Sequence, residues 1–273
     1  MNTMHDEQFR QLLNYFQYSW AGYRKVRKGV KKRISRHMQQ MQCAALNEYL
    51  KLLETSAKER QECERQMAVS ISRIFRDRKL WLDLENEILP RLIEAQNEKI
   101  KVWSAGCARG EEVYSFMIVW DRLRVRFQRL PKLEMIATDL HPDYIEKAKA
   151  GIYTKSSLKE VTDDIRVVYF DEKKGGNRYD VKAILKKNIT WQIRNMFSDP
   201  PGSGFHIIFL RNNLLTYYRS DLIIAPLTRI IDSLNPDGWL IIGSHEKLPD
   251  EFSGLTRNPS TPWAYRKGIP VKY

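Results

Sequence analysis

The spacing of apolar residues along this chain changes once, near residue 96. Before that point apolar side chains recur every three or four positions, in two series: Val30, Ile34, Met38, Met41, and then Leu46, Tyr49, Leu50, Leu53. This spacing places side chains on one face of a helix. A charged amphipathic segment, 59–69, follows, and 81–95 reads as a further helix around Pro90. Because no Pro or Gly lies between Val30 and Leu89, we expect a helical N-terminal domain over residues 1–88.

After the polar stretch 96–99, short apolar runs alternate with helical patterns. The expected strands are Ile100–Ser104, Glu134–Thr138, Ile189–Arg194, Phe205–Leu210, Trp239–Gly243 and Trp263–Arg266. The expected helices are Glu111–Phe127, Pro142–Ala150 and Leu222–Leu234, and a small excursion or hairpin is expected at Asp171–Lys187. Alternation of this kind is typical of βαβ units around a parallel sheet. We therefore predict an α/β domain over residues 100–273, joined to the helical domain by a linker at 89–99.

Composition narrows the class of protein. The 273 residues are 42% hydrophobic, which is ample for a buried core, and no apolar run approaches the ~20 residues of a membrane span. The N-terminus lacks the basic and apolar regions of a signal peptide. Three cysteines form no CxxC pair, so we expect neither a disulfide framework nor a metal site. A cytoplasmic protein is the simplest interpretation.

The net charge of +13 is concentrated near the N-terminus. Between Gln8 and Asn47 there is no acidic residue, while nine are basic: Arg10, Arg24, Lys25, Arg27, Lys28, Lys31, Lys32, Arg33 and Arg36. Such a block attracts an acidic partner, which is nucleic acid, anionic lipid or an acidic protein face. The alternative is an ordinary solvated helix face.

The most specific local pattern is the turn Ala105-Gly106-Cys107-Ala108-Arg109-Gly110 between a strand and a helix. Small residues let a ligand approach the backbone, and a helix N-terminus presents free N–H groups. The pattern lacks the Gly-Lys-Ser/Thr of a phosphate loop and the three glycines of a dinucleotide site. Instead, Glu111 and Glu112 follow, which repel pyrophosphate and suit a cationic or hydroxyl-bearing ligand such as S-adenosylmethionine. A plain turn with acids placed for the helix dipole is the alternative.

Polar residues also close the later strands. Asp139 ends the second strand, 33 residues beyond Gly106, where nucleotide-binding α/β folds place a carboxylate for ribose hydroxyls. A helix N-cap is its alternative role. Asn195 and the pair Arg211-Asn212 follow the next two strands, so they face the same crevice.

Together these motifs resemble the chemotaxis-receptor methyltransferase (CheR-type) family of protein-glutamate O-methyltransferases. The resemblance runs through Trp103–Ser115, Ala137–Asp139, Gly151–Tyr153, Asn195-Met196, Arg211-Asn212 and the late Pro236…Glu246 pattern. Residues 72–77 resemble the T-x-F-F-R-[DN] arm of the family, and 30–34 its basic helix. It implies a seven-stranded, mostly parallel Rossmann-like sheet behind a small all-α domain, and S-adenosyl-L-methionine as the cofactor.

The resemblance also implies roles for individual residues. The cofactor contacts would be Ser70, Ser72, Arg76, Gly106, Glu112, Asp139, Asn195, Met196, Arg211 and Asn212. Arg76 and Arg211 would orient the incoming carboxylate through paired N–H donors. A glutamate is already ionised at neutral pH, since its free pKa is about 4.3, so the transfer needs no general base.

One position departs from the family pattern. The family has a Tyr near the transferred methyl group, whereas this chain has Thr216 there and Tyr217 one place later. A shift of one residue in an extended segment turns a side chain to the other face, so Tyr217 need not replace it. Thr216 is therefore a candidate catalytic position that bears on the acceptor more than on the cofactor.

The expected acceptor is a glutamate of an acidic protein such as a methyl-accepting receptor, docked by the basic helix Arg24–Arg36. Membrane contact would then be indirect, through the receptor, and we expect a monomer. Three alternatives stay open: a methyltransferase for another protein or a small molecule, a non-catalytic cofactor-binding regulator, and a nucleic-acid methyltransferase. The last is the weakest, because Asp199-Pro200-Pro201 lacks the following aromatic residue of an amino-methylating motif.

Overall fold

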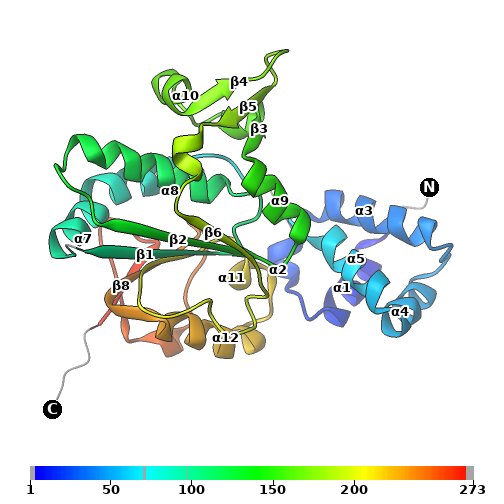
Figure 1. Cartoon of the computed structure of the whole chain (residues 1–273). Coiled ribbons are helices and arrows are strands. Elements are labelled where there is room, and N and C mark those ends of the chain that lie inside the picture. Colours follow the sequence, from blue (N-terminus) through cyan, green and yellow to red (C-terminus); the bar gives the residue numbers. More distant parts are fainter. Residues whose placement is uncertain (1–3, 70–71, 97, 269–273) are drawn as a thin grey trace. The chain divides into compact units, whose positions relative to one another are not determined.

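A computed structural model describes residues 4–69, 72–96 and 98–268, and the chain divides into two compact units (Figure 1). The helical unit comprises residues 1–71 and 213–223, and the sheet unit comprises residues 72–212 and 224–273. The boundary thus lies before residue 88. Residues 89–99, expected as a linker, include helix α7 (Leu89–Ala95) and the first residue of strand β1 (Lys99–Ala105).

The helical unit buries the residues that helical spacing singles out. Its helices are α1 (Asp6–Tyr15), α2 (Trp20–Tyr23), α3 (Arg27–Gln40), α4 (Leu46–Thr55), α5 (Ala57–Met67) and α11 (Leu214–Tyr217). Val30 and Ile34 of α3 share one core cluster with Leu46 and Leu53 of α4. The amphipathic helices expected from the apolar spacing are therefore confirmed. Within the described residues, no helix is both long and apolar enough to cross a membrane.

The helical unit is completed by a segment from much later in the chain. The backbone N–H of Ser19 donates to the carbonyl of Tyr217 at 2.8 Å, and the Tyr217 ring packs 5.0 Å from that of Tyr23. This contact needs a glycine at position 22, since a Cβ there would lie 2.0 Å from the carbonyl oxygen of Thr216. The backbone of α2 therefore touches the backbone of α11.

Two glycines of this unit should respond in opposite ways to alanine. We expect Gly22→Ala to lower the thermal unfolding midpoint, because its methyl group clashes with backbone that cannot move aside alone. At Gly29, inside α3, a Cβ would meet only Arg33 Nη1 at 3.8 Å. Gly29→Ala should therefore stabilise by about 0.5–1 kcal/mol through helix propensity. Equal midpoints for the two variants would contradict the close contact at Gly22.

The sheet unit contains the expected seven-stranded, mostly parallel sheet. Its strand order is β6 (Ile189–Ile193), β2 (Lys132–Asp139), β1, β7 (Phe205–Leu210), β8 (Leu234–Ile242), β10 (Ala264–Lys267) and β9 (Leu255–Arg257). Strands β6 to β8 are parallel, and β10 is antiparallel to both its neighbours. The chain moves from β1 to β2 on one side and returns to β7 on the other. Such a switch point opens a crevice at the carboxyl ends of the strands.

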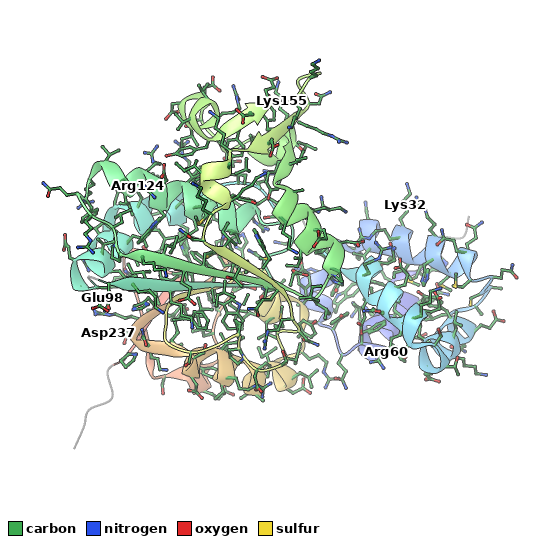
Figure 2. All side chains as sticks on the ribbon, viewed as in Figure 1. Lys32, Arg60, Glu98, Arg124, Lys155 and Asp237 are labelled. Carbon is green, nitrogen blue, oxygen red and sulfur yellow. The ribbon has the colours of Figure 1, made fainter. Side chains whose placement is uncertain are left out.

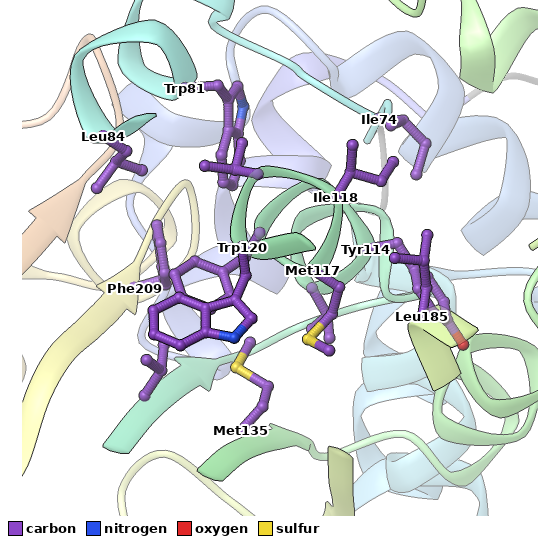
Figure 3. Close-up of a cluster of buried hydrophobic side chains, with 14 of the residues drawn as sticks. Ile74, Trp81, Leu84, Tyr114, Met117, Ile118, Trp120, Met135, Leu185 and Phe209 are labelled. Atoms are coloured by element: carbon purple, nitrogen blue, oxygen red, sulfur yellow. The ribbon is translucent and has the colours of Figure 1, made fainter. Parts of the chain in front are cut away.

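Helices cover both faces of this sheet (Figure 1). One face carries α6 (Arg78–Asp83), a π-helical turn (Leu84–Ile88), α7 and α8 (Glu111–Arg122), and α12 (Ser220–Asp232) lies across the other. Figure 3 shows Met135 and Phe209 of the strands beneath Trp120 of α8 and Trp81 of α6. The Trp81 and Phe209 rings stack at 5.7 Å. This packing fixes α6, and with it the preceding residues, above the middle of the sheet.

A small antiparallel sheet interrupts the alternation after α9 (Pro142–Ala150). It is formed by β3 (Ile152–Thr154), β5 (Arg178–Val181) and β4 (Phe170–Glu172), with α10 (Asp163–Tyr169) between β3 and β4. The hairpin expected at Asp171–Lys187 is the β4–β5 part of it, turning at Gly175 and Gly176 with positive φ. The structure therefore extends the predicted excursion back to Ile152.

Candidate functional site

The loop between β1 and α8 folds back onto the end of β2. The backbone N–H groups of Gly106 and Cys107 both donate to the carbonyl of Thr138, at 2.8 and 2.9 Å. Gly106, Ala108 and Gly110 have positive φ values of 74°, 49° and 84°. At Gly110 a Cβ would lie 2.9 Å from the Ala148 Cβ, so the glycine permits close packing there. The small residues singled out in the sequence are thus required by a tight left-handed turn.

Asp139 is joined to this loop through both carboxylate oxygens. Its Oδ2 accepts from the Ala108 N–H and its Oδ1 from the His141 N–H, each at 2.9 Å. Burial raises the pKa of Asp139, and the two backbone donors act in the opposite direction. Helix α9 begins at Pro142 with His141 as its N-cap, so Asp139 does not take the N-cap position. It stands at the end of β2, where a ribose-binding acid is expected.

Arg211, directly after β7, connects two other parts of the site. Its Nη1 donates to Glu112 Oε2 at 3.0 Å, and its Nη2 to Asp77 Oδ2 at 2.5 Å. Glu112 also accepts from the Ser104 hydroxyl at 2.7 Å through its other oxygen. The Arg211 side chain is only 4% exposed, so these are partly buried ion pairs. Arg211 thereby joins β7, the start of α8 and the arm before α6.

Arg76 lies beside Asn212, the next residue after Arg211. Its Nη2 donates to Asn212 Oδ1 at 3.3 Å. Glu246 holds the Asn212 backbone in place, since its Oε2 accepts from the N–H groups of Asn212 at 2.9 Å and Gly243 at 2.6 Å. A Cβ at Gly243 would lie 2.7 Å from that same oxygen. The late glycine and glutamate of the sequence pattern therefore join the ends of β7 and β8.

The remaining candidate residues are placed differently. Asn195 is exposed after β6, and its Oδ1 accepts from the Phe197 N–H at 2.9 Å, with Met196 half-buried beside it. Ser72 is half-buried at the start of the arm, whereas Ser70 lies outside the described residues. Thr216 belongs to α11 of the helical unit. The structure thus groups Arg76, Glu112, Asp139, Arg211 and Asn212 at the carboxyl ends of the strands of one unit.

Sequence reasoning missed three contacts of this group. Asp77 and Glu246 lay within recognised patterns but had no assigned role, and Ser104 was taken only as the end of a strand. A signal for Asp77 existed, because a buried arginine after a strand requires an acidic partner.

The charges of the group suit a cationic cofactor. Asp77, Glu112, Asp139 and Glu246 are four carboxylates against the guanidinium groups of Arg76 and Arg211. An ammonium and a sulfonium are stabilised by such an excess of negative charge, whereas a pyrophosphate is repelled. The buried Arg211 Nε has no protein hydrogen-bond partner. No metal-binding group of three or more His, Cys, Asp or Glu occurs in the described ranges.

Comparisons with known proteins agree with this chemistry. Residues 70–264 match the family model of the CheR methyltransferase, SAM binding domain. The chain is 30% identical to a chemotaxis protein methyltransferase of Listeria innocua, over 84% of this chain and 86% of that protein. It is 32% identical to chemotaxis protein methyltransferase 1 of Vibrio cholerae, over 68% of each.

Two further similarities are more limited. An uncharacterized 104.1 kDa protein of Rhodobacter capsulatus is 29% identical over 88% of this chain, which spans only 25% of that protein. The similarity to a crystal structure of a TehB-like SAM-dependent methyltransferase from Corynebacterium glutamicum covers 69% of this chain and 92% of that one, at 16% identity and a TM-score of 0.37.

Replacing Asp139 should weaken cofactor binding. We expect Asp139→Asn to raise the Kd for S-adenosylhomocysteine about tenfold or more, because a charged hydrogen-bond acceptor is lost at the ribose position. Isothermal titration calorimetry on the folded protein measures this. Glu146→Gln, which removes an exposed carboxylate of α9 paired with Lys149, is the matched control and should leave the Kd unchanged. An unchanged Kd for Asp139→Asn would remove Asp139 from the cofactor site.

Proposed function

Because the chain belongs to the CheR methyltransferase family, we propose that this S-adenosylmethionine-dependent methyltransferase methylates a glutamate side chain of a protein such as a chemotaxis receptor. The observation that carries the proposal is its 30% identity, over 84% of the chain, to a protein named a chemotaxis protein methyltransferase. The product would be a methyl ester.

The residues of the site are suited to this transfer. When bound, S-adenosylmethionine would supply a methyl group on its sulfonium: as a carboxylate oxygen bonds to the methyl carbon, the carbon–sulfur bond breaks and the sulfur leaves as the neutral thioether of S-adenosylhomocysteine. A glutamate with a free pKa of about 4.3 is already ionised, so the site needs only to orient it. Both Nη groups of Arg211 contact carboxylates of the chain itself. Arg76 is the other arginine that the family resemblance names for this role, and we assign the incoming carboxylate to it on that resemblance. Asp139 would hold the ribose, and Glu112 the cationic end of the cofactor.

A second candidate function is methylation of a different acceptor, and one observation favours it. The chain has Thr216 where the family has a tyrosine, and the next two tyrosines are packed within the helical unit. The rings of Tyr217 and Tyr218 lie 5.0 Å from those of Tyr23 and Tyr18, respectively. Because both rings are packed in this way, neither Tyr217 nor Tyr218 is an evident replacement for the family's tyrosine. The difference at Thr216 therefore favours a different acceptor.

The basic helix is the proposed docking surface for an acidic partner. Arg27 and Lys31 pair with Asp6, and Arg33 donates to the carbonyls of Gln66 and Ala68, at 2.7 and 2.9 Å. Within the segment Arg24–Arg36, the basic residues that stay exposed are Arg24, Lys25, Lys28, Lys32 and Arg36. Three of them, Lys28, Lys32 and Arg36, recur every fourth position of α3 and lie along one face, where Lys32 stands out from the helix (Figure 2), and Arg24 and Lys25 come just before α3. We call these five residues the basic stripe.

The acceptor class can be tested directly. Incubation with tritiated S-adenosylmethionine and receptor-bearing membranes should give base-labile volatile counts, which mark methyl esters. A protein that binds S-adenosylhomocysteine yet labels no membrane would contradict the receptor acceptor. Base-stable counts would favour the second candidate function.

The basic stripe should affect the affinity for the acceptor and leave the affinity for the cofactor unchanged. We expect Lys28→Glu together with Lys32→Glu to raise the KM for the acidic acceptor about tenfold, since surface charges steer association. The Kd for S-adenosylhomocysteine should not change. Lys51→Glu with Lys58→Glu makes the same charge change on α4 and α5 of the same unit and is the control. Equal effects of the two double variants would exclude a specific role for the stripe.

A further inference from the structure

The arm Ser72–Asp77 is held in a conformation that its residue types do not favour. Phe75 and Asp77 have positive φ values of 59° and 62°, and they flank Arg76. A left-handed backbone is unfavourable for a bulky residue such as Phe, and Asp tolerates it better. Such strain persists only where surrounding contacts enforce it, and it concentrates at functional sites.

Contacts within the sheet unit fix the arm on both sides of Arg76. Before it, the Ile74 N–H donates to the Ser157 carbonyl at 2.9 Å, and the Phe75 N–H to the Ser115 hydroxyl at 2.8 Å. At Arg76 itself, the backbone carbonyl accepts from Trp81 Nε1 at 2.7 Å and from Arg211 Nη2 at 3.4 Å. The backbone is therefore clamped while the Arg76 side chain reaches Asn212.

The Asp77 carboxylate supplies the last of these restraints. Its Oδ2 accepts from Arg211 Nη2 at 2.5 Å, and its Oδ1 from the Ser244 hydroxyl at 3.4 Å. Arg211 follows β7 and Ser244 follows β8, so one side chain of the arm contacts two adjacent strand ends. Since the same Arg211 nitrogen also reaches the Arg76 carbonyl, the ion pair acts on the backbone that carries the Arg76 side chain.

We propose that Asp77 is a positioning residue, whose ion pair with Arg211 holds the left-handed arm so that the Arg76 guanidinium is presented to the cofactor site. This inference rests on the other role that the family resemblance gives Arg76, that of a cofactor contact, and is independent of which acceptor is methylated. Asp77 contacts neither cofactor nor acceptor in this scheme and acts through Arg76.

A double-mutant cycle on S-adenosylhomocysteine affinity tests the proposal. Asp77→Asn keeps the size and the tolerance of positive φ but removes the charge, and it should raise the Kd about tenfold. In an Arg76→Gln background the same change should add less than about twofold, because the residue through which it acts is already gone. Fold-changes that simply multiply would overturn the proposal.

Hydrogen exchange separates positioning from a general loss of stability. Peptides covering 72–80 should exchange about tenfold faster in Asp77→Asn, whereas β1 peptides covering 99–105 should keep their rate. If Asp77→Asn fails to fold, Asp77→Gly, which accepts positive φ without strain, offers the same loss of carboxylate. Arg78→Gln, at the neighbouring exposed position, should match the wild type.

The outcomes for this inference and for the proposed function are distinguishable. Absence of labelling on every membrane would reject the receptor acceptor and leave the affinity cycle intact. Unchanged exchange at 72–80 in Asp77→Asn would overturn the positioning role even if receptors are methylated.

Discussion

The arrangement of the site depends on neutralising one buried guanidinium. The guanidinium group of an arginine carries a positive charge, so Arg211, which is buried beneath the arm, needs anions close by. Its two partners are Asp77 in the arm and Glu112 at the start of α8, two segments that lie far apart in the sequence. Its guanidinium also lies 5.7 Å from the Trp81 ring. Removal of either carboxylate would leave the buried Arg211 with one anionic partner in place of two.

A single carboxylate also holds the loop between β1 and α8. Asp139 accepts backbone N–H groups from two directions, and one of them belongs to Ala108, whose φ is 49°. The carboxylate therefore holds the loop that it shares with the cofactor. The small residues between Ala105 and Gly110 allow the tight turn, and the acid after β2 holds that turn through a hydrogen bond. The two sequence features therefore serve the same loop.

Periodic patterns in the sequence predicted the elements that are long and regular. Pro142–Ala150 and Phe205–Leu210 have the predicted bounds, because each is a regular run ended by a clear change of residue type. The three-residue strands β3 and β9 were not predicted, since three residues show no period. Of the site, the sequence indicated which residues stand at strand ends, and the family resemblance added the arm. Pattern alone does not tell that Arg211 contacts Asp77, or that Arg33 within the basic block serves the carbonyls after α5. Such contacts join residues far apart in sequence.

The return of residues 213–223 to the helical unit has a consequence for biosynthesis. The N-terminal helices leave the ribosome with the Gly22 and Tyr23 surface uncovered, and the 141 residues 72–212 must follow before Asn213 emerges. At ~5–20 residues per second this interval lasts roughly 7–30 s. During it the aromatic surface of Tyr18 and Tyr23 is exposed to other nascent chains and to chaperones. A fragment that ends at residue 71 would lack residues 213–223, so this aromatic surface would stay exposed permanently. The helical unit therefore cannot be produced as one continuous N-terminal fragment.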